Sequence, residues 1–242
     1  MTVTINDAWL NAPTDLTLVH NDVHVWRIEL DIPETELQNL SDILSADEIQ
    51  RAERFYKEQH RQRFVVGRGI LRIILGRYLN LEPQTLEFRY EPTGKPVLAD
   101  TCGGNKLYFN LSHSQGLALC AVSSDRPLGV DLEYVTPISD VLSLAKQFFS
   151  PTEYAVMRSL PPNLKQQTFF RYWTCKEAYL KATGAGLAQL QQIEVNLSPG
   201  EPAKLNTASD WSLLEMQPVK NSAAAVAIEG SSLGLKCWEY SM

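Results

Sequence analysis

The chain of 242 residues is poor in cysteine, carries no excess of positive charge and has no long apolar run. Its four cysteines show neither close pairing nor metal-site spacing, so reduced thiols in a cytoplasmic protein are expected. A net charge of −6 argues against nucleic acid as a partner. No apolar stretch reaches the length of a membrane span, and residues 1–13 lack the pattern of a signal peptide, so we expect no membrane partner.

Turn-forming residues divide the chain into two halves. The turn at 125–127 is the best boundary, which gives an N-terminal half at 1–126 and a C-terminal half at 127–242. Periodicity predicts a long helix at 60–78 and another at 164–183, so the second half repeats the helix-then-strands order of the first. Strands are expected at 23–30, 88–90, 107–111, 117–122, 128–133, 193–197, 211–216, 223–228 and 235–240.

Two capping-box patterns predict where shorter helices begin. Ser45 and Glu48 have the Ser-x-x-Glu spacing, which predicts a helix from there to about Lys57. Ser150 and Glu153 repeat this spacing with a proline at the first helical position. Both glutamates are therefore expected to have a structural role.

The strand at 128–133 carries two acids with apolar neighbours. Asp131 and Glu133 are two residues apart, so their side chains emerge on the same face of a strand. One interpretation is a solvated acidic face. The other is a site for a hard cation such as Mg²⁺, which prefers carboxylate oxygens and the phosphates of a substrate.

A segment of the second long helix offers a third acid. Trp173, Glu177 and Lys181 are spaced by four and share a helix face. They could be a surface ion pair beside a half-buried tryptophan, or Glu177 could complete a metal site. His113 leaves a similar choice between a turn histidine bonded between strands and a site residue.

Positive charge is concentrated in one region, because eight of the 22 basic residues lie between Arg51 and Arg77. For most of these arginines the simplest interpretation is a solvated, ion-paired helix face.

Four motifs together resemble one known family. They are the strand motif Gly129–Glu133, the helix motif Trp173-x-x-Lys176-Glu177-x-x-x-Lys181, the segment Asn110–Ser114 and the turn Gly94-Lys95-Pro96. In their order along the chain and with this spacing, together with Arg54-Phe55-Tyr56 and Gly67-Arg68 upstream, they resemble the 4'-phosphopantetheinyl transferases of the surfactin-synthetase type. The similarity extends from about Asp47 to Gly186.

The resemblance implies a fold and a reaction. The fold would be α+β, with two similar halves related by pseudo-twofold symmetry, each with a small antiparallel sheet and a long helix. Coenzyme A would bind between the halves of a monomer. The reaction would be Mg²⁺-dependent transfer of the 4'-phosphopantetheine arm to a serine of an apo acyl, peptidyl or polyketide carrier protein, with release of 3',5'-ADP. The sequence does not specify which carrier or pathway is served.

The resemblance and the demands of that reaction imply roles for individual residues. The expected metal ligands are Asp131, Glu133 and Glu177. The expected catalytic residues are Glu177 as the base, directly or through water, with Lys181 and His113. The expected coenzyme A contacts are Arg51, Gly94, Lys95, Asn110, Ser112, His113, Asp131, Lys176 and Lys181.

Two departures and two rivals accompany this hypothesis. Glu48 stands where some family members have a lysine, which would leave fewer phosphate contacts on that side. Glu153 lies where the family often has an acid near the metal, but a capping role is favoured for it. A metal-dependent hydrolase of phosphate esters could use the same acids on water, and a coenzyme-binding protein without turnover is the second rival.

Overall fold

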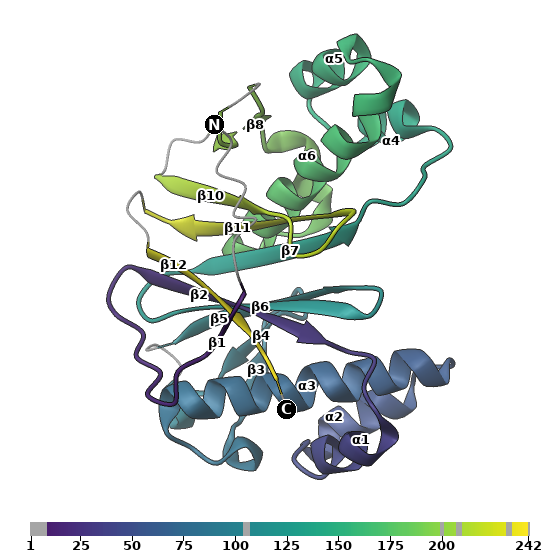
Figure 1. Ribbon diagram of the computed structural model, residues 1–242. Coiled ribbons are helices and arrows are strands. Elements are labelled where there is room, and N and C mark those ends of the chain that lie inside the picture. The colour runs from purple at the N-terminus through teal and green to yellow at the C-terminus, as the bar shows by residue number, and fades with distance from the viewer. Residues whose placement is uncertain (1–8, 104–106, 199–200, 207–209, 231–233, 242) are drawn as a thin grey trace.

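The computed structural model describes residues 9–103, 107–198, 201–206, 210–230 and 234–241. Four layers are stacked in it: helices, a five-stranded sheet, a three-stranded sheet and further helices (Figure 1). The sheet orders are β1-β12-β2-β6-β5 and β10-β11-β7. The α+β class predicted from the sequence is confirmed. Among the described residues, no helix is both long and apolar enough to cross a membrane.

The first half supplies most of the five-stranded sheet and the helices below it in Figure 1. The long helix α3 (Glu58–Leu79) buries an apolar stripe against this sheet, together with side chains of β2 and β6. The remaining elements are β1 (Leu10–Asn11), β2 (Asp22–Glu29), α1 (Glu34–Ser41), α2 (Ala46–Glu53), η1 (Pro83–Thr85), β3 (Phe88–Tyr90), β4 (Pro96–Leu98), η2 (Asp100–Cys102), β5 (Tyr108–Ser114) and β6 (Leu117–Ser123).

The second half repeats this plan with α6 (Pro162–Thr183), which packs on β7 and β11. Its remaining elements are β7 (Leu128–Tyr134), α4 (Val141–Phe148), α5 (Pro151–Ser159), η3 (Leu187–Gln192), β8 (Val195–Asn196), β9 (Lys204–Leu205), β10 (Trp211–Met216), β11 (Ser222–Glu229) and β12 (Gly234–Glu239). β12 leaves the second half and pairs parallel with β1 and β2. The five-stranded sheet is therefore mixed, whereas the three-stranded sheet is antiparallel.

A separate apolar core lies between the two sheets. Alternate residues of β2 and β6, such as Val25 and Leu119, meet Val130, Leu132 and Val226 of the other sheet, and all five are buried. Each such side chain contributes about 1.5–3 kcal/mol when it leaves water. This core between the sheets joins the two halves. The domain boundary predicted at residue 126 stays a prediction.

The predicted helix starts are found, and one predicted end is wrong. Capping boxes open α2 at Ser45 and α5 at Ser150. However, α2 ends at Glu53 and does not continue to Lys57. The chain bends there, and the Phe55 ring packs against Phe64 of α3 with centroids 5.4 Å apart.

Candidate active site

A close approach of backbones brings α6 onto β7. A Cβ atom added to Gly129 would lie 2.2 Å from the carbonyl oxygen of Ala178 and 2.4 Å from the nitrogen of Ala182. Only glycine fits this contact, because any side chain would push the helix away from the strand. The acids of the strand and the charged face of the helix therefore come together at one place.

Lys181 makes the direct link between these two elements. Its Nζ donates to Asp131 Oδ1 at 2.6 Å and to Ser112 Oγ at 3.0 Å. Asp131 is 4% exposed, so this ion pair lies largely out of water. The structure thus brings Ser112, Asp131 and Lys181, all predicted site residues, into one network.

Polar side chains of β5 fix the position of β7, although the two strands belong to different sheets. Ser112 Oγ donates to Asp131 Oδ1 at 3.0 Å, and Ser114 Oγ donates to Glu133 Oε2 at 2.9 Å. The side-chain oxygen of Asn110 accepts from the amide nitrogen of Val130 at 2.9 Å. The buried side chain of Asn110 therefore joins the two sheets, and its contact with coenzyme A stays a prediction.

Ser114 is a residue whose part in the site the sequence analysis missed. The alternation of polar residues at 110, 112 and 114 was the available signal, because such residues share one face of a strand. It could not be interpreted without knowing that this face meets a strand of the other sheet.

Burial and mutual repulsion raise the pKa values of two acids. Burial, followed by the charge of Asp131, raises the pKa of Glu177 to about 7, while Lys181 opposes the rise. Burial and the charge of Asp131 also raise the pKa of Glu133, against the hydrogen bond from Ser114. The charges of all three carboxylates therefore act on one another, as a shared site requires.

The donor chemistry of these acids fits a hard cation. Lys181 pairs with Oδ1 of Asp131, but the buried Oδ2 has no hydrogen-bond partner among the described residues, so it is an acceptor without a donor. Nevertheless, within the described residues no three His, Cys, Asp or Glu side chains form a closed metal-binding group. The ligand types suit Mg²⁺, but the carboxylates are not already gathered around a single point.

Lys95 connects the first half to this region. It follows the turn at Gly94, which has a positive φ of 84°, and its Nζ donates to the carbonyl oxygens of Lys181 at 2.6 Å and Leu128 at 3.3 Å. Burial lowers the pKa of its ammonium. Lys95 thus joins the β3–β4 turn to α6 and β7.

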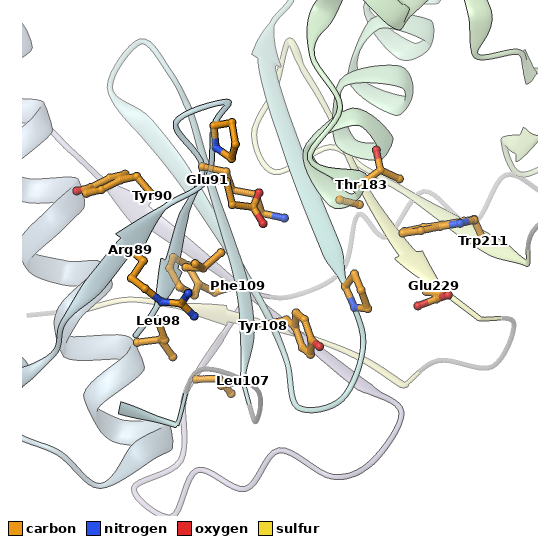
Figure 2. Close-up of a pocket in the computed structure, with 15 residues that line it drawn as sticks. Arg89, Tyr90, Glu91, Leu98, Leu107, Tyr108, Phe109, Thr183, Trp211 and Glu229 are labelled. Carbon is orange, nitrogen blue, oxygen red and sulfur yellow. The ribbon is translucent and has the colours of Figure 1, made fainter. Parts of the chain in front are cut away.

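A cavity of about 750 Å³, the inter-half cavity, opens beside Lys95. Figure 2 shows Arg89, Tyr90 and Phe109 of the first half on one side and Thr183, Trp211 and Glu229 of the second half on the other. Its volume lies within the range of about 300–1,000 Å³ that is usual for ligand pockets. The cavity reaches the beginning of β7, and the acids lie further along the same strand.

Arg51 and His113 lie on the first-half side of this region. The guanidinium carbon of Arg51 is 5.6 Å from the ring centroid of Phe64 and 5.8 Å from that of Tyr90, which also lines the inter-half cavity. His113 is exposed, but partial desolvation of its ring, followed by the charge of Lys181, lowers its pKa. The charges of Arg63 and His60, which the sequence analysis did not select, act on the ring in the same direction.

Lys176 is a predicted site residue that the structure turns away from the acids. It is fully buried, and its ammonium bonds to Glu153 and lies 5.2 Å from the ring centroid of Phe149. Successive helix residues are about 100° apart around the axis, so Lys176 faces the second-half core while Glu177 faces β7. Glu153 completes the capping box of α5, as predicted, and also pairs with Lys176.

Two packed α+β halves place an acid–lysine network beside an inter-half cavity, an arrangement typical of a site for an anionic ligand. Comparison with known proteins identifies the family. Residues 127–228 match a model described as the 4'-phosphopantetheinyl transferase superfamily, and residues 32–125 match one described as 4'-phosphopantetheinyl transferase, N-terminal. The chain is 57% identical, over 98% of its length and 100% of the relative, to 4'-phosphopantetheinyl transferase HetI of Nostoc sp..

More distant relatives are also found. The chain is 30% identical to 4'-phosphopantetheinyl transferase Sfp of Bacillus subtilis, over 68% of this chain and 71% of the relative. A crystal structure of a holo-(acyl-carrier-protein) synthase from Bacillus anthracis in complex with coenzyme A matches at 23% identity and a TM-score of 0.38, over 43% of this chain and 96% of that one. The chain belongs to the 4'-phosphopantetheinyl transferase family and is a phosphopantetheinyl transferase.

Proposed function

We propose that the protein transfers the 4'-phosphopantetheine arm of coenzyme A to a serine of an apo carrier protein and releases 3',5'-ADP. The supporting observation is the network in which Lys181 joins Asp131 to Ser112, beside the inter-half cavity. Carboxylates and ammonium groups at one place suit a reaction at a diphosphate. The carrier would be an acyl, peptidyl or polyketide carrier.

The chain's own cations would position the donor. Lys181 and Lys95 would contact the diphosphate, and Arg51 with His113 would contact the phosphate on the ribose. The two lysines already lie together, because the Lys95 ammonium bonds the Lys181 carbonyl oxygen. As a basic group on a flexible stem, each lysine can follow a phosphate oxygen during the reaction.

Glu177 would accept the proton of the acceptor serine. A general base works best when its pKa is near the operating pH, and burial with the charge of Asp131 raises the pKa of Glu177 to about 7. A bond forms between the serine oxygen and the phosphorus of the pantetheine phosphate. The bond from that phosphorus to the leaving oxygen breaks, and the leaving group is 3',5'-ADP.

Asp131, Glu133 and Glu177 would hold the Mg²⁺ ion of the enzyme. A cation held by these carboxylates would supply positive charge to offset that of the diphosphate and the leaving oxygen. The buried Oδ2 of Asp131, which has no partner among the described residues, supports this assignment. We also propose the surfactin-synthetase type, a monomeric state and a cytoplasmic location, on the basis of the two-half plan and the composition of the chain.

A transfer assay against a panel of apo carrier proteins, followed by intact mass, tests the proposal. The wild type should add one phosphopantetheine arm to at least one carrier when Mg²⁺ is present. Glu177→Gln should lower the rate by about 10²–10⁴-fold, because the base is lost while the shape is kept. Release of 3',5'-ADP without any carrier would indicate a hydrolase, and coenzyme A binding without turnover would indicate a binding protein; either result would refute the proposal.

A further inference from the structure

The strand β7 has a neighbouring strand on one side and side chains on the other. It is the last strand of the three-stranded sheet and pairs with β11, so the amide groups on its other side need partners from elsewhere. Three of these amides, at Val130, Leu132 and Tyr134, donate to side chains of β5. A row of polar side chains therefore takes the place of a second neighbouring strand.

Two members of this row are serines spaced by two along β5. The amide of Leu132 donates to Ser112 Oγ at 3.3 Å, and the amide of Tyr134 donates to Ser114 Oγ at 3.2 Å. Residues two apart on a strand share a face, so both hydroxyls point toward β7. Each hydroxyl is thus attached to a backbone whose position is already fixed by β11.

These bonds determine the direction in which each hydroxyl donates. A hydroxyl has a single hydrogen to donate and two lone pairs that accept. Because Ser114 Oγ accepts from the Tyr134 amide, its own hydrogen is available for Glu133 Oε2 at 2.9 Å. Ser112 repeats the arrangement two residues earlier and donates to Asp131 Oδ1 at 3.0 Å. Each serine therefore holds the acid that immediately precedes its amide partner in β7.

The two serines differ in what else depends on them. Ser112 Oγ also accepts from Lys181 Nζ at 3.0 Å, so its hydroxyl links the backbone, the acid and the lysine. Ser114 links the backbone to Glu133. Removal of the Ser114 hydroxyl therefore frees one carboxylate and leaves the Lys181–Asp131 pair in place.

We infer that Ser114 is a positioning residue, which holds Glu133 in the orientation in which this carboxylate binds the cation. The inference rests on the proposed function, in which Glu133 is a metal ligand. A carboxylate that already bonds a fixed hydroxyl loses less rotational freedom when a cation binds, so the affinity is higher. The first half of the chain thus orients a metal ligand that belongs to the second half.

Removal of the hydroxyl tests this inference by metal binding itself. Mn²⁺ prefers the same oxygen ligands as Mg²⁺, and the electron paramagnetic resonance signal of the free ion reports its binding. Ser114→Ala should raise the Kd for Mn²⁺ roughly tenfold, because the partner of a ligating carboxylate is lost. Ser114→Thr keeps a hydroxyl and should restore the Kd to within about twofold of the wild type.

Transfer assays give a second measure of the same effect. Ser114→Ala should need roughly tenfold more Mg²⁺ to reach its half-maximal rate. Its kcat at saturating Mg²⁺ and its KM for coenzyme A should stay within about threefold of the wild type, because the ligand itself is still present.

Ser222→Ala is the matched control. Ser222 lies opposite Tyr134 in β11, is 4% exposed, and donates to the carbonyl oxygen of Val219 at 2.7 Å and not to an acid. Its loss should lower the thermal unfolding temperature, as the loss of Ser114 does, but should leave the Kd for Mn²⁺ within about twofold. Stability and metal affinity are thereby separated.

The remaining outcomes would each overturn the inference. An unchanged Kd for Mn²⁺ in Ser114→Ala, no recovery in Ser114→Thr, or an equal loss of affinity in Ser222→Ala would show that the hydroxyl does not orient the metal ligand. A raised KM for coenzyme A with unchanged Mn²⁺ affinity would assign the hydroxyl to substrate binding. Failure of the wild type to bind Mn²⁺ would refute the metal site of the proposed function, and the inference with it.

Discussion

The two long helices of this protein have the same length and a similar buried ion pair, but they have different roles. Each has 22 residues, and the fifteenth residue of each is a buried basic side chain: Arg72 in α3 and Lys176 in α6. Each base pairs with the buried glutamate of a capping box, Glu48 or Glu153. The recurrence of this pair in both halves is what a pseudo-twofold relation predicts.

The difference between the helices lies one residue further along. Glu177 follows Lys176 and faces the acids of β7, whereas the residue after Arg72 is Ile73, which packs against the first-half core. The buried basic residue supports the fold in both halves. The residue after it takes part in the proposed chemistry only in the second half, where it is Glu177. A lysine in a functional motif can therefore be a structural residue.

Breaking the two buried pairs should have the largest effect. Lys176→Met and Arg72→Met each leave a buried glutamate without its base and should lower the free energy of unfolding by about 3–5 kcal/mol. The loss should be greater for Arg72, because it also donates to the carbonyl oxygens of Pro83 and Leu86. Chemical denaturation measures both, with the exposed Lys146→Met as the control.

The same variants separate the two interpretations of Lys176. If its role is structural, the folded fraction of Lys176→Met should retain transfer activity. A loss of transfer with unchanged unfolding free energy would instead support the phosphate contact predicted from the sequence.

The approach of α6 to β7 should give the next largest effect. Gly129→Ala should cost about 3 kcal/mol, because its Cβ atom meets backbone atoms that cannot move independently. Transfer should fall as well, since Glu177 and Lys181 would move away from Asp131. Gly186→Ala is the matched control, as its added Cβ atom meets none of the described atoms within 4 Å; an equal loss in both variants would contradict the argument.

Low pH should destabilise the first half more than the second, and this difference should be the smallest of the predicted effects. All four histidines lie in the first half, and burial lowers the pKa of His24, which is 1% exposed, from 6.5 to about 4. A depressed histidine pKa favours the neutral ring in the folded state. Its stabilising contribution is therefore complete above pH 6.5 and is lost as the pH drops toward 4.

Hydrogen exchange of β2 and β10 between pH 7 and pH 4 measures this effect. Protection of β2 should decrease before that of β10, and His24→Gln should reduce the difference. Parallel loss in both strands would show that the two halves open as one unit.

Much of the fold could be predicted because local signals and the tertiary structure agree. The capping boxes at Ser45 and Ser150 and the strand at 88–90 are found where expected. The end of α2 could not be predicted, because the chain bends after Glu53 and the Phe55 ring there packs on Phe64, a contact that the capping pattern does not reveal. The direction of β12 also depends on which sheet has a free edge, and strand propensity carries no such information.

The site, too, could be predicted only where local sequence spacing determines the arrangement. Spacing correctly indicated that Glu177 and Lys181 share a helix face, and the structure brings both to Asp131. It could not show that Lys176 is turned toward Glu153, nor that the amide of Asn110 is used to join two sheets. Those roles depend on partners that are distant in the sequence.

The position of β12 has a consequence for how the protein is made. A ribosome completes β2 and its neighbour β6 long before it reaches β12, so the other edge of β2 stays unpaired until β12 has been made. A fragment cut at residue 126 would keep that edge permanently, and its self-association is expected. The first half, although similar in plan to the second, therefore depends on a strand of the second half to complete its sheet.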